Sequence, residues 1–296
     1  MKFVQSFWSK PFFDDLNKEN WNFRHFGGFP SSFLFYCSWV YSCLSIKKYY
    51  PNLHLVTDDF GIKIFKQALG LPYASFSNAL NDISDYNSGA WAIGKLYTYR
   101  LQREPFCHLD GDIFLFGPVL DEIIKTPLFC QSYNHSGDQY AFIHPYVHKN
   151  FDKVPKEFAA DLSSKIRYIN VGVIGGNDID VFKQYTDAAF ELIDNNQDKL
   201  HKINSSLINL YYEQFLLSNM IASKNLEITS LFSKPDDTHK YNFAAFHNVP
   251  WHSQYVHLIS HLKRSTEYME QIAVRLQKQY PEYYARLVAF HNTKAS

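Results

Sequence analysis

The sequence has no excess of charge of either sign. It contains 29 Lys and Arg residues against 29 Asp and Glu residues, and no run of basic residues stands out along the chain. Proteins that bind nucleic acid or anionic membranes through bulk electrostatics need a positive excess on at least one surface. We therefore expect no nucleic-acid partner, while a locally positive pocket for a diphosphate remains compatible with this balance.

Cysteine is scarce, and no segment reads as a signal peptide or a membrane span. The cysteines form neither a CxxC pair nor a zinc-type spacing, which suits a reducing compartment. They are Cys37, Cys43, Cys107 and Cys130. Charged residues follow the N-terminus too early for a signal-peptide core. The longest apolar stretch, 33–46, is too short and too rich in Ser and Tyr to cross a bilayer. We expect a cytoplasmic protein without a transmembrane segment.

Internal repeats and low-complexity linkers are absent as well, and residues 1–120 instead alternate between predicted strands and helices. Strands are predicted at 1–7, 53–58 and 106–116, the last of them interrupted at Gly111, and helices at 31–50, 61–70 and 88–103. This alternation is typical of an α/β fold with a doubly wound, mostly parallel sheet. Ligands of such sheets bind beyond the carboxyl ends of the strands. Asp58, which follows the second strand, is therefore a candidate nucleoside contact.

The second half of the sequence is less regular. We predict a strand with a glycine-rich end at 167–176, amphipathic helices at 181–196 and 205–225, and a terminal helix over 265–296. His144 and His148 fall in a segment that we expect to be a loop rather than a second metal site.

Two carboxylates stand close together in the apolar segment FCHLDGDIFLF, where Asp110 and Asp112 flank Gly111. On an extended chain, residues two apart project to the same side. Two such carboxylates suit a divalent cation that bridges to phosphate oxygens. Asp178 and Asp180 have the same spacing, but their polar setting predicts a solvated loop or a helix cap. Because the burial of two acids is costly without a cation or donors, we assign the cation site to the first pair.

Four further segments stand in a recognisable order around this pair. They are a lysine-bearing helix that leads into the Asp-Gly-Asp strand, then INVGVIGG, YYEQFLLSN and HLISHLK. They contribute Lys95, Asn170, Gly172, Glu213, Gln214, His257 and Lys263. In this order the segments resemble the motifs of glycogenin-type and related bacterial galactosyltransferases, which have the GT-A fold.

The resemblance implies a role for each of these residues. Asp110, Asp112 and His257 are expected to hold Mn²⁺ (or Mg²⁺). Glu213 and Gln214 are expected near the reacting carbon of the sugar. The implied donor contacts are Lys95, Asn170, Gly172 and Lys263.

The resemblance also implies a domain organisation and an activity. A single GT-A catalytic domain with a mixed sheet and flanking helices would occupy 1–264, followed by a C-terminal helix at 265–296. Residues 1–120 would bind the nucleotide, and 121–264 the acceptor and the donor sugar. The implied reaction moves a sugar from a nucleotide-diphosphate sugar, with UDP favoured, to a hydroxyl acceptor, and retains the anomeric configuration.

The sequence departs from the family pattern at three positions. Val171, Glu213 and Ser260 stand where the family has serine, aspartate and glycine. These departures indicate a distant relative, so the exact donor and the stereochemistry are not transferred with the resemblance. The acceptor and the oligomeric state do not follow from the sequence.

Alternatives to this interpretation stay open. The Asp-Gly-Asp segment superficially resembles the start of haloacid-dehalogenase-type phosphohydrolases, although Ile113 and Phe114 do not fit that pattern. A non-catalytic carbohydrate- or metal-binding protein would keep the same residues. His257 and His261 could share a helix face and bind zinc. We prefer His257 as a ligand beside the two aspartates because its distance from Lys263 along the chain fits the family spacing.

Overall fold

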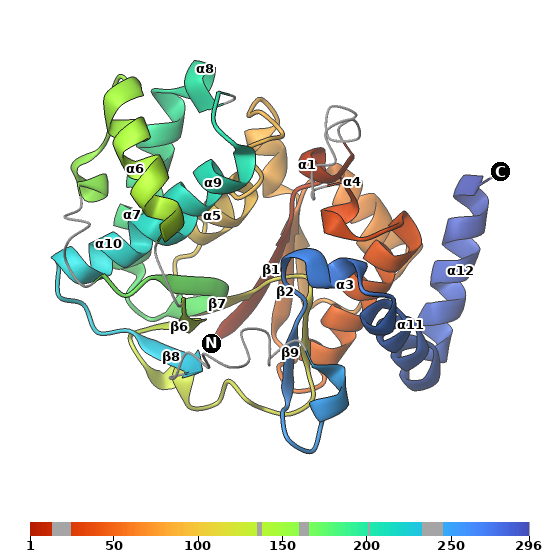
Figure 1. Cartoon of the computed structure of the whole chain (residues 1–296). Helices are drawn as coiled ribbons and strands as arrows, with labels where there is room; N and C mark the ends of the chain where they lie inside the picture. Colours follow the sequence, from red (N-terminus) through yellow and green to blue (C-terminus); the bar gives the residue numbers. More distant parts are fainter. Residues whose placement is uncertain (14–24, 135–137, 160–165, 201, 233–244, 296) are drawn as a thin grey trace. The chain divides into compact units, whose positions relative to one another are not determined.

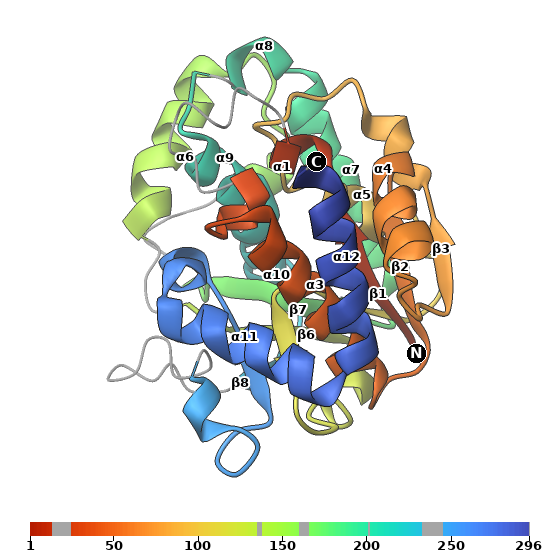
Figure 2. The ribbon, with the colours of Figure 1, turned by 90° about the vertical axis from the view of Figure 1, so that its right-hand side faces the viewer.

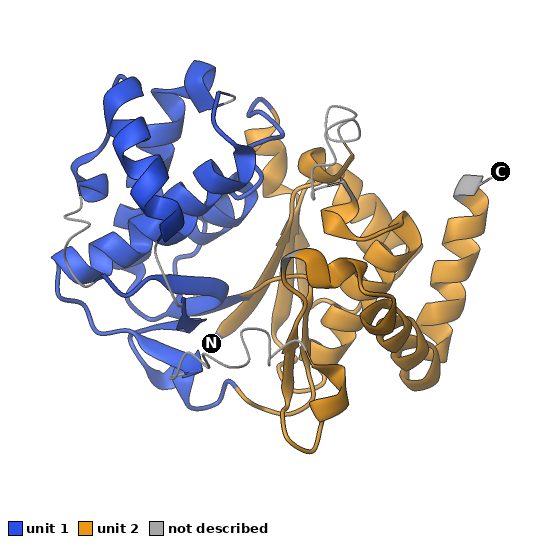
Figure 3. Cartoon of the chain, viewed as in Figure 1, with its two compact units in different colours: residues 1, 85–108, 120–240 blue, residues 2–84, 109–119, 241–296 orange. Residues whose placement is uncertain are grey.

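The computed structural model of the chain describes residues 1–13, 25–134, 138–159, 166–200, 202–232 and 245–295 (Figure 1). The chain divides into two compact units, and each is described by itself (Figure 3). Unit 1 consists of Met1, Asp85–His108 and Leu120–Lys240. Unit 2 consists of Lys2–Ser84, Leu109–Val119 and Tyr241–Ser296. The catalytic-domain boundary expected after residue 264 stays a prediction.

Unit 2 contains a group of parallel strands in the order β3-β2-β1. Their bounds are β1 (Lys2–Phe7), β2 (Leu53–Thr57) and β3 (Ser75–Ser77). The first two confirm the strands predicted at 1–7 and 53–58. Parallel strands need a crossover between them, and here helices supply it.

The crossovers of unit 2 begin at side-chain caps. They consist of α3 (Ser32–Lys47), α4 (Asp59–Gly61) and the π-helical η2 (Ile62–Ala68). Ser31 caps α3 by accepting a hydrogen bond from the backbone N–H of Leu34, as the sequence predicts. Phe7 of β1 packs against Trp39 of α3 and Phe65 of η2, with ring centroids 5.3 and 4.9 Å apart. These rings join the strands to both crossovers.

The C-terminal segment of unit 2 forms two helices that pack against α3 (Figure 2). They are α11 (Thr266–Gln279) and α12 (Pro281–Ala295). The prediction of one terminal helix is therefore wrong at Tyr280, where the chain breaks. Pro281 explains the break, because proline fits the first position of a helix and cannot continue a preceding one.

A short antiparallel ribbon completes unit 2. It pairs β5 (Ile113–Leu115) with β9 (Tyr255–His257), two segments far apart in the sequence. Both strands are buried along their whole length. The ribbon brings the end of the Asp-Gly-Asp segment beside the segment that contains His257.

Unit 1 contains strands in the order β4-β7-β6-β8. Their bounds are β4 (Phe106–Leu109), β6 (Leu128–Tyr133), β7 (Ile169–Gly176) and β8 (Thr229–Phe232). β6 runs antiparallel to β7 and parallel to β8. The boundary between the units falls inside β4, after His108.

The helices of unit 1 include the three that the sequence predicts around the motifs. Their bounds are α5 (Ile93–Arg100), α6 (Asp138–Asn150), α7 (Ile179–Asp194), α8 (Gln197–Leu200), α9 (Ser205–Leu210), the π-helical η6 (Tyr211–Phe215) and α10 (Leu216–Ser223). Asp178 caps α7, because its side chain accepts a hydrogen bond from the N–H of Val181. His144 and His148 lie on α6, so the loop expected there is wrong. The π-helical turn interrupts the helix predicted over 205–225.

Short helices connect the remaining elements. They are α1 (Lys10–Phe13), η1 (His25–Gly28), η3 (Ala79–Ile83), η4 (Ile123–Lys125), η5 (Lys156–Phe158), η8 (Phe246–Asn248) and η9 (Ser260–Arg264). The α/β class and the mixed strand directions expected from the sequence are confirmed. None of the described helices is both long enough and apolar enough for a membrane span.

Candidate functional site

The segment Asp110–Asp112 is a turn between β4 and β5. The backbone N–H of Ile113 donates to the carbonyl of Asp110 at 3.2 Å. The interruption predicted at Gly111 is therefore confirmed, because the strands end at Leu109 and begin again at Ile113. The expectation of an extended chain between the two acids is wrong, and strand alternation does not bring their side chains together. The positions of the Asp110 and Asp112 side chains are set by the turn. Gly111 at its centre leaves room for Trp39 of α3.

Polar side chains of β1 and α3 fix the backbone of this turn. Gln5 donates from Nε2 to the carbonyl of Asp110 at 3.3 Å and to Oγ of Ser42 at 2.9 Å. Ser42 in turn donates to the carbonyl of Ile113 at 2.7 Å. Gln5 and Ser42 are both fully buried. Sequence reasoning missed them, because an isolated Gln on a strand and a Ser within a helix carry no motif.

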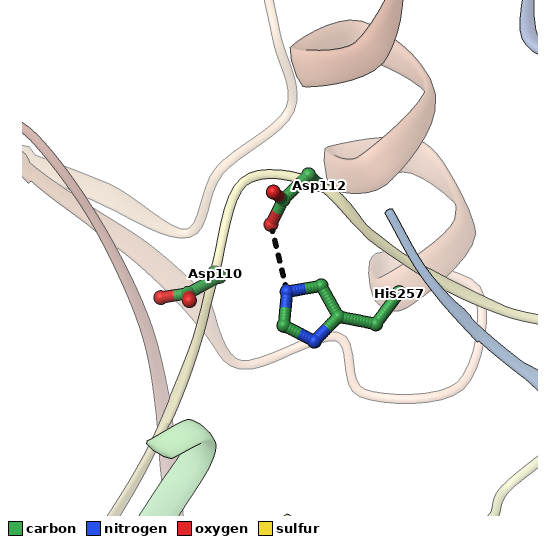
Figure 4. Close-up of side chains that lie close together, drawn as sticks. All are labelled: Asp110, Asp112 and His257. Atoms are coloured by element: carbon green, nitrogen blue, oxygen red, sulfur yellow. Dashed lines mark ion pairs between the residues drawn. The ribbon is translucent and has the colours of Figure 1, made fainter. Parts of the chain in front are cut away.

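The register of the β5–β9 ribbon places His257 beside the turn. His257 pairs with Ile113, and the N–H of Leu258 donates to the carbonyl of Asp112 at 3.1 Å. The Nε2 of His257 lies 3.2 Å from Oδ1 of Asp112, as Figure 4 shows. The two elements therefore bring together two residues that are 145 positions apart in the sequence (257 − 112).

Asp110, Asp112 and His257 form one cluster. Each offers a ligand atom, and these atoms all lie within 4.8 Å of one another. Asp112 and His257 are buried, and Asp110 is half-buried. The zinc alternative with His257 and His261 on one helix face is wrong, because His257 lies on β9 and His261 on η9.

The carboxyl of Asp112 is buried directly beside the ammonium of Lys263. The Nζ of Lys263 lies 2.6 Å from Oδ2 of Asp112. Burial alone would raise the pKa of the Asp112 carboxyl, but the charges of Lys263 and His257 outweigh it and hold that pKa well below its usual value. Asp112 is therefore a carboxylate at neutral pH, as a metal ligand must be.

The cluster fits a divalent cation by its donor set, and the distance between His257 and Asp112 is that of two neighbouring ligands. Two cis ligands at about 2.1 Å from a cation stand roughly 3 Å apart, since such sites are near octahedral. The 3.2 Å separation of His257 Nε2 and Asp112 Oδ1 agrees with that value. Carboxylate oxygens suit Mg²⁺ and Mn²⁺, and the imidazole adds a donor that suits transition metals.

Asp58 lies in unit 2 at the end of β2, where it caps α4. Its Oδ1 accepts from the N–H of Gly61 at 2.9 Å. Its Oδ2 accepts from the N–H and the hydroxyl of Ser9 at 2.7 and 2.6 Å. The carboxylate therefore has a structural role in joining Ser9, which lies between β1 and α1, to the start of α4. Its contact with a nucleoside stays a prediction.

Unit 1 holds a buried ion pair of Lys95 and Glu213. The Nζ of Lys95, on α5, lies 2.7 Å from Oε1 of Glu213 on η6, and also donates to the carbonyl of Val171 at 3.3 Å. The side chains are only 13% and 2% exposed. Burial and the charge of Lys95 lower the pKa of the nearby His108 well below its usual value. The ion pair holds Lys95 in place through the carboxylate of Glu213, which is 118 residues away in the sequence (213 − 95).

The other motif residues of unit 1 have local partners. Asn170 accepts at Oδ1 from the N–H of Gly172 at 2.9 Å, which shapes the course of β7. Gln214 accepts at Oε1 from Nδ2 of Asn134 at 3.2 Å. Asn134 also donates to the carbonyl of Ile169 at 3.2 Å. Sequence reasoning did not identify Asn134, because it lies at the end of a strand without a motif.

The predicted site residues therefore fall into two sets. Unit 2 brings together Asp110, Asp112, His257 and Lys263. Unit 1 contains Lys95, Asn170, Gly172, Glu213 and Gln214, of which Lys95 and Glu213 are in direct contact. The assigned roles of both sets stay predictions.

Residues 1–290 match the family described as "Family of unknown function (DUF6734)". No curated protein matches the chain. Among solved structures, the chain is similar to the galactosyltransferase LgtC in complex with donor and acceptor sugar analogs, with 11% identity and a TM-score of 0.47 over 97% of this chain and 100% of that one. It is also similar to the glycosyltransferase GlyE of Streptococcus pneumoniae TIGR4, with 11% identity and a TM-score of 0.41 over 99% and 63%. A third similar structure is mouse xyloside xylosyltransferase 1 in its apo form, with 9% identity and a TM-score of 0.42 over 86% and 96%.

Proposed function

The chain belongs to DUF6734, a family of unknown function, and we propose that it is a metal-dependent glycosyltransferase of the GT-A type. It transfers a sugar from a nucleotide-diphosphate sugar, with UDP favoured, to a hydroxyl acceptor. The observation that carries the proposal is the cluster of Asp110, Asp112 and His257 with the ammonium of Lys263 beside it. A divalent cation next to a fixed positive charge suits a diphosphate leaving group.

Unit 2 supplies the groups that stabilise the leaving diphosphate. Asp110, Asp112 and His257 would hold Mn²⁺ or Mg²⁺. Gln5 and Ser42 donate hydrogen bonds to the backbone carbonyls of Asp110 and Ile113, and these bonds keep the turn with the two acids in place. When bound, the cation neutralises negative charge on the diphosphate as a Lewis acid. Lys263 adds a second positive charge for the same oxygens.

Unit 1 supplies the residues proposed for the sugar. Lys95, Asn170 and Gly172 bind the donor, and Glu213 and Gln214 orient the donor sugar and the acceptor. The resemblance of the motif order implies retention of the anomeric configuration. The π-helical turn that contains Glu213 and Gln214 supports this assignment, because such turns occur frequently at functional sites.

The first experiment measures binding and turnover with the purified chain. We expect the melting temperature to rise more with UDP and Mn²⁺ together than with either alone. In a panel of nucleotide sugars with Mn²⁺, we expect release of a nucleoside diphosphate that stops on addition of EDTA. Absence of any stabilisation by nucleoside diphosphates would refute the proposal.

Variants then test the metal assignment. Asp112→Asn and His257→Ala are expected to abolish the metal-dependent part of donor binding and hydrolysis. Asp180→Asn is the matched control, because Asp180 belongs to the other Asp-x-Asp pair, in the first turn of α7. If the Asp112 and His257 variants behaved like the control, the metal site would be elsewhere.

The same measurements separate the two remaining alternatives. A phosphohydrolase would release inorganic phosphate from phosphate esters without a nucleotide sugar. A non-catalytic binding protein would show the combined UDP and Mn²⁺ stabilisation without any turnover across the panel of donors and acceptors.

A further inference from the structure

Lys263 holds Asp112 in the way that a bound cation would. Its Nζ lies 2.6 Å from Oδ2 of Asp112, and the two side chains are 16% and 11% exposed. The other carboxylate oxygen of Asp112 faces His257 Nε2 at 3.2 Å. Both oxygens of this predicted ligand are therefore already engaged by groups of the protein.

Two further groups hold the ammonium of Lys263 in this position. Its Nζ donates to the carbonyl of Gly27 at 3.1 Å and lies 5.5 Å from the ring centroid of Phe29. Gly27 has a φ of 61°, a left-handed conformation that glycine adopts without strain. The segment around Gly27 thus presents a carbonyl and an aromatic face to one cation.

The ammonium of Lys263 and a divalent metal ion would compete for the carboxylate of Asp112. Asp110 and Asp112 contribute two negative charges, and Lys263 contributes one positive charge at hydrogen-bond distance from one of them. A divalent ion on the same carboxylates would meet the repulsion of an ammonium a few ångströms away, in a setting where burial weakens screening. A bound diphosphate offsets this repulsion, because its negatively charged oxygens attract the divalent ion and the ammonium of Lys263 at the same time.

We propose that Lys263 is an internal counter-cation that makes binding of the divalent metal depend on the nucleoside diphosphate. The inference rests on the proposed function and deepens it. Without a diphosphate, Lys263 neutralises Asp112 and weakens metal binding. With a diphosphate, its flexible side chain transfers the ammonium from Asp112 to a phosphate oxygen, and Asp112 becomes available to the metal.

The proposal requires positive coupling between the two ligands, and coupling of this kind is reciprocal. It also predicts an effect that a purely supporting lysine would not have. If Lys263 only kept Asp112 in position for the metal, its removal would weaken metal binding. If Lys263 competes with the metal, its removal strengthens metal binding in the absence of nucleotide.

The test measures Mn²⁺ binding to the whole chain by the electron paramagnetic resonance signal of free Mn²⁺, with and without UDP. For the wild type, we expect weak binding of Mn²⁺ alone and about tenfold tighter binding with UDP, within the usual range of coupling between sites. For Lys263→Met, we expect Mn²⁺ alone to bind about tenfold more tightly than to the wild type, with most of the UDP effect lost. Lys263→Arg keeps the charge and should keep the wild-type pattern.

Lys66→Met is the matched control. Lys66 also lies over an aromatic ring, 5.7 Å from the centroid of Phe76, but it is exposed and lies on η2, outside the Asp110–Asp112–His257 cluster. Melting curves of each variant check that it is folded. Unchanged or weaker Mn²⁺ binding by Lys263→Met, or a full UDP effect in that variant, overturns the inference alone. A wild type that binds neither Mn²⁺ nor UDP overturns the proposed function itself.

Discussion

Gly111 and Trp39 are so close that an added Cβ on Gly111 would lie 2.4 Å from Cζ2 of the indole. No real Cβ atom tolerates such a contact, so only glycine fits at the centre of the Asp110–Asp112 turn. Trp39 belongs to α3 and is itself buried. The position of both acids is thus set by the packing of the turn on this helix.

We therefore expect Gly111→Ala to destabilise the protein. Overpacking of a filled interior typically costs about 1–3 kcal/mol, and urea unfolding should show a loss of this size. Adding Trp39→Phe should recover part of the loss, because phenylalanine lacks the indole atoms nearest to the new methyl group.

Gly89→Ala is the control for this prediction. An added Cβ there would meet only the end of the Asn87 side chain, at 3.0 Å. If Gly111→Ala were as stable as Gly89→Ala, the turn would have to accommodate a side chain, and the close packing on Trp39 would not fix it.

The sequence predicted the pair of acids but not the geometry that unites them. The spacing of Asp110 and Asp112 identified the candidate ligands, yet a strand was the wrong reason for their proximity. His257 entered through the family spacing, and its contact depends on the register of a ribbon between distant segments. Sequence periodicity does not predict the register between distant segments. It also does not predict the hydrogen bonds that Gln5 and Ser42 make at the turn.

The buried pair of Lys95 and Glu213 gives a second prediction. Removing one partner of a buried ion pair leaves an uncompensated charge, which typically costs about 3–5 kcal/mol. We expect Lys95→Met and Glu213→Gln each to lower the free energy of urea unfolding by an amount toward this range. The double variant should lose less free energy of unfolding than the two single variants added together, because each single variant already loses the interaction between the two side chains.

An exposed ion pair of nearly the same length controls for this measurement. Lys125 and Glu122 lie 2.8 Å apart, but their side chains are 66% and 86% exposed. Lys125→Met should leave the free energy of urea unfolding nearly unchanged, since solvent screens such pairs. Equal losses at Lys95 and Lys125 would mean that Lys95 is not held in a low-dielectric setting.

Local patterns predicted the secondary structure best in short apolar segments and at helix caps. The strands β1 and β2 followed from apolar segments that are buried on both faces, and the cap of α3 at Ser31 followed from capping chemistry. The π-helical turn at η6 did not, because its residues are compatible with an ordinary helix. Its conformation and the Lys95 contact depend on packing between segments that the sequence places far apart.

Asp58 gives a third prediction, which separates its structural role from its proposed nucleoside contact. Asp58→Ala removes the cap of α4 and the bonds to Ser9, and should cost about 1–2 kcal/mol of stability. Ser9→Ala removes only one of these bonds and should cost less. If Asp58 also contacts the nucleoside, its variant should weaken binding of UDP with Mn²⁺ while Ser9→Ala does not. If the two folded variants bound UDP with equal affinity, Asp58 would not contact the nucleoside.

The last prediction concerns acid stability and rests on His144 of α6. Its Nδ1 lies 2.9 Å from the hydroxyl of Tyr211, and its ring centroid lies 4.3 Å from that of His148. Burial, followed by the charge of His148, lowers the pKa of His144 to about 4. In the unfolded chain, a histidine has a pKa of about 6.5.

Between these two pKa values, the unfolded chain binds a proton that the folded protein does not accept. The contribution of His144 to stability is therefore fully present above about pH 6.5 and is lost as the pH falls toward about 4. We expect the urea midpoint to fall between pH 7 and pH 5, and to fall less in His144→Gln, whose amide can still hydrogen-bond Tyr211. His252→Gln, at an exposed histidine, controls for the loss of one imidazole. A pH dependence of His144→Gln equal to that of the wild type would contradict the prediction, because the proton uptake of the unfolded state would then belong to other groups.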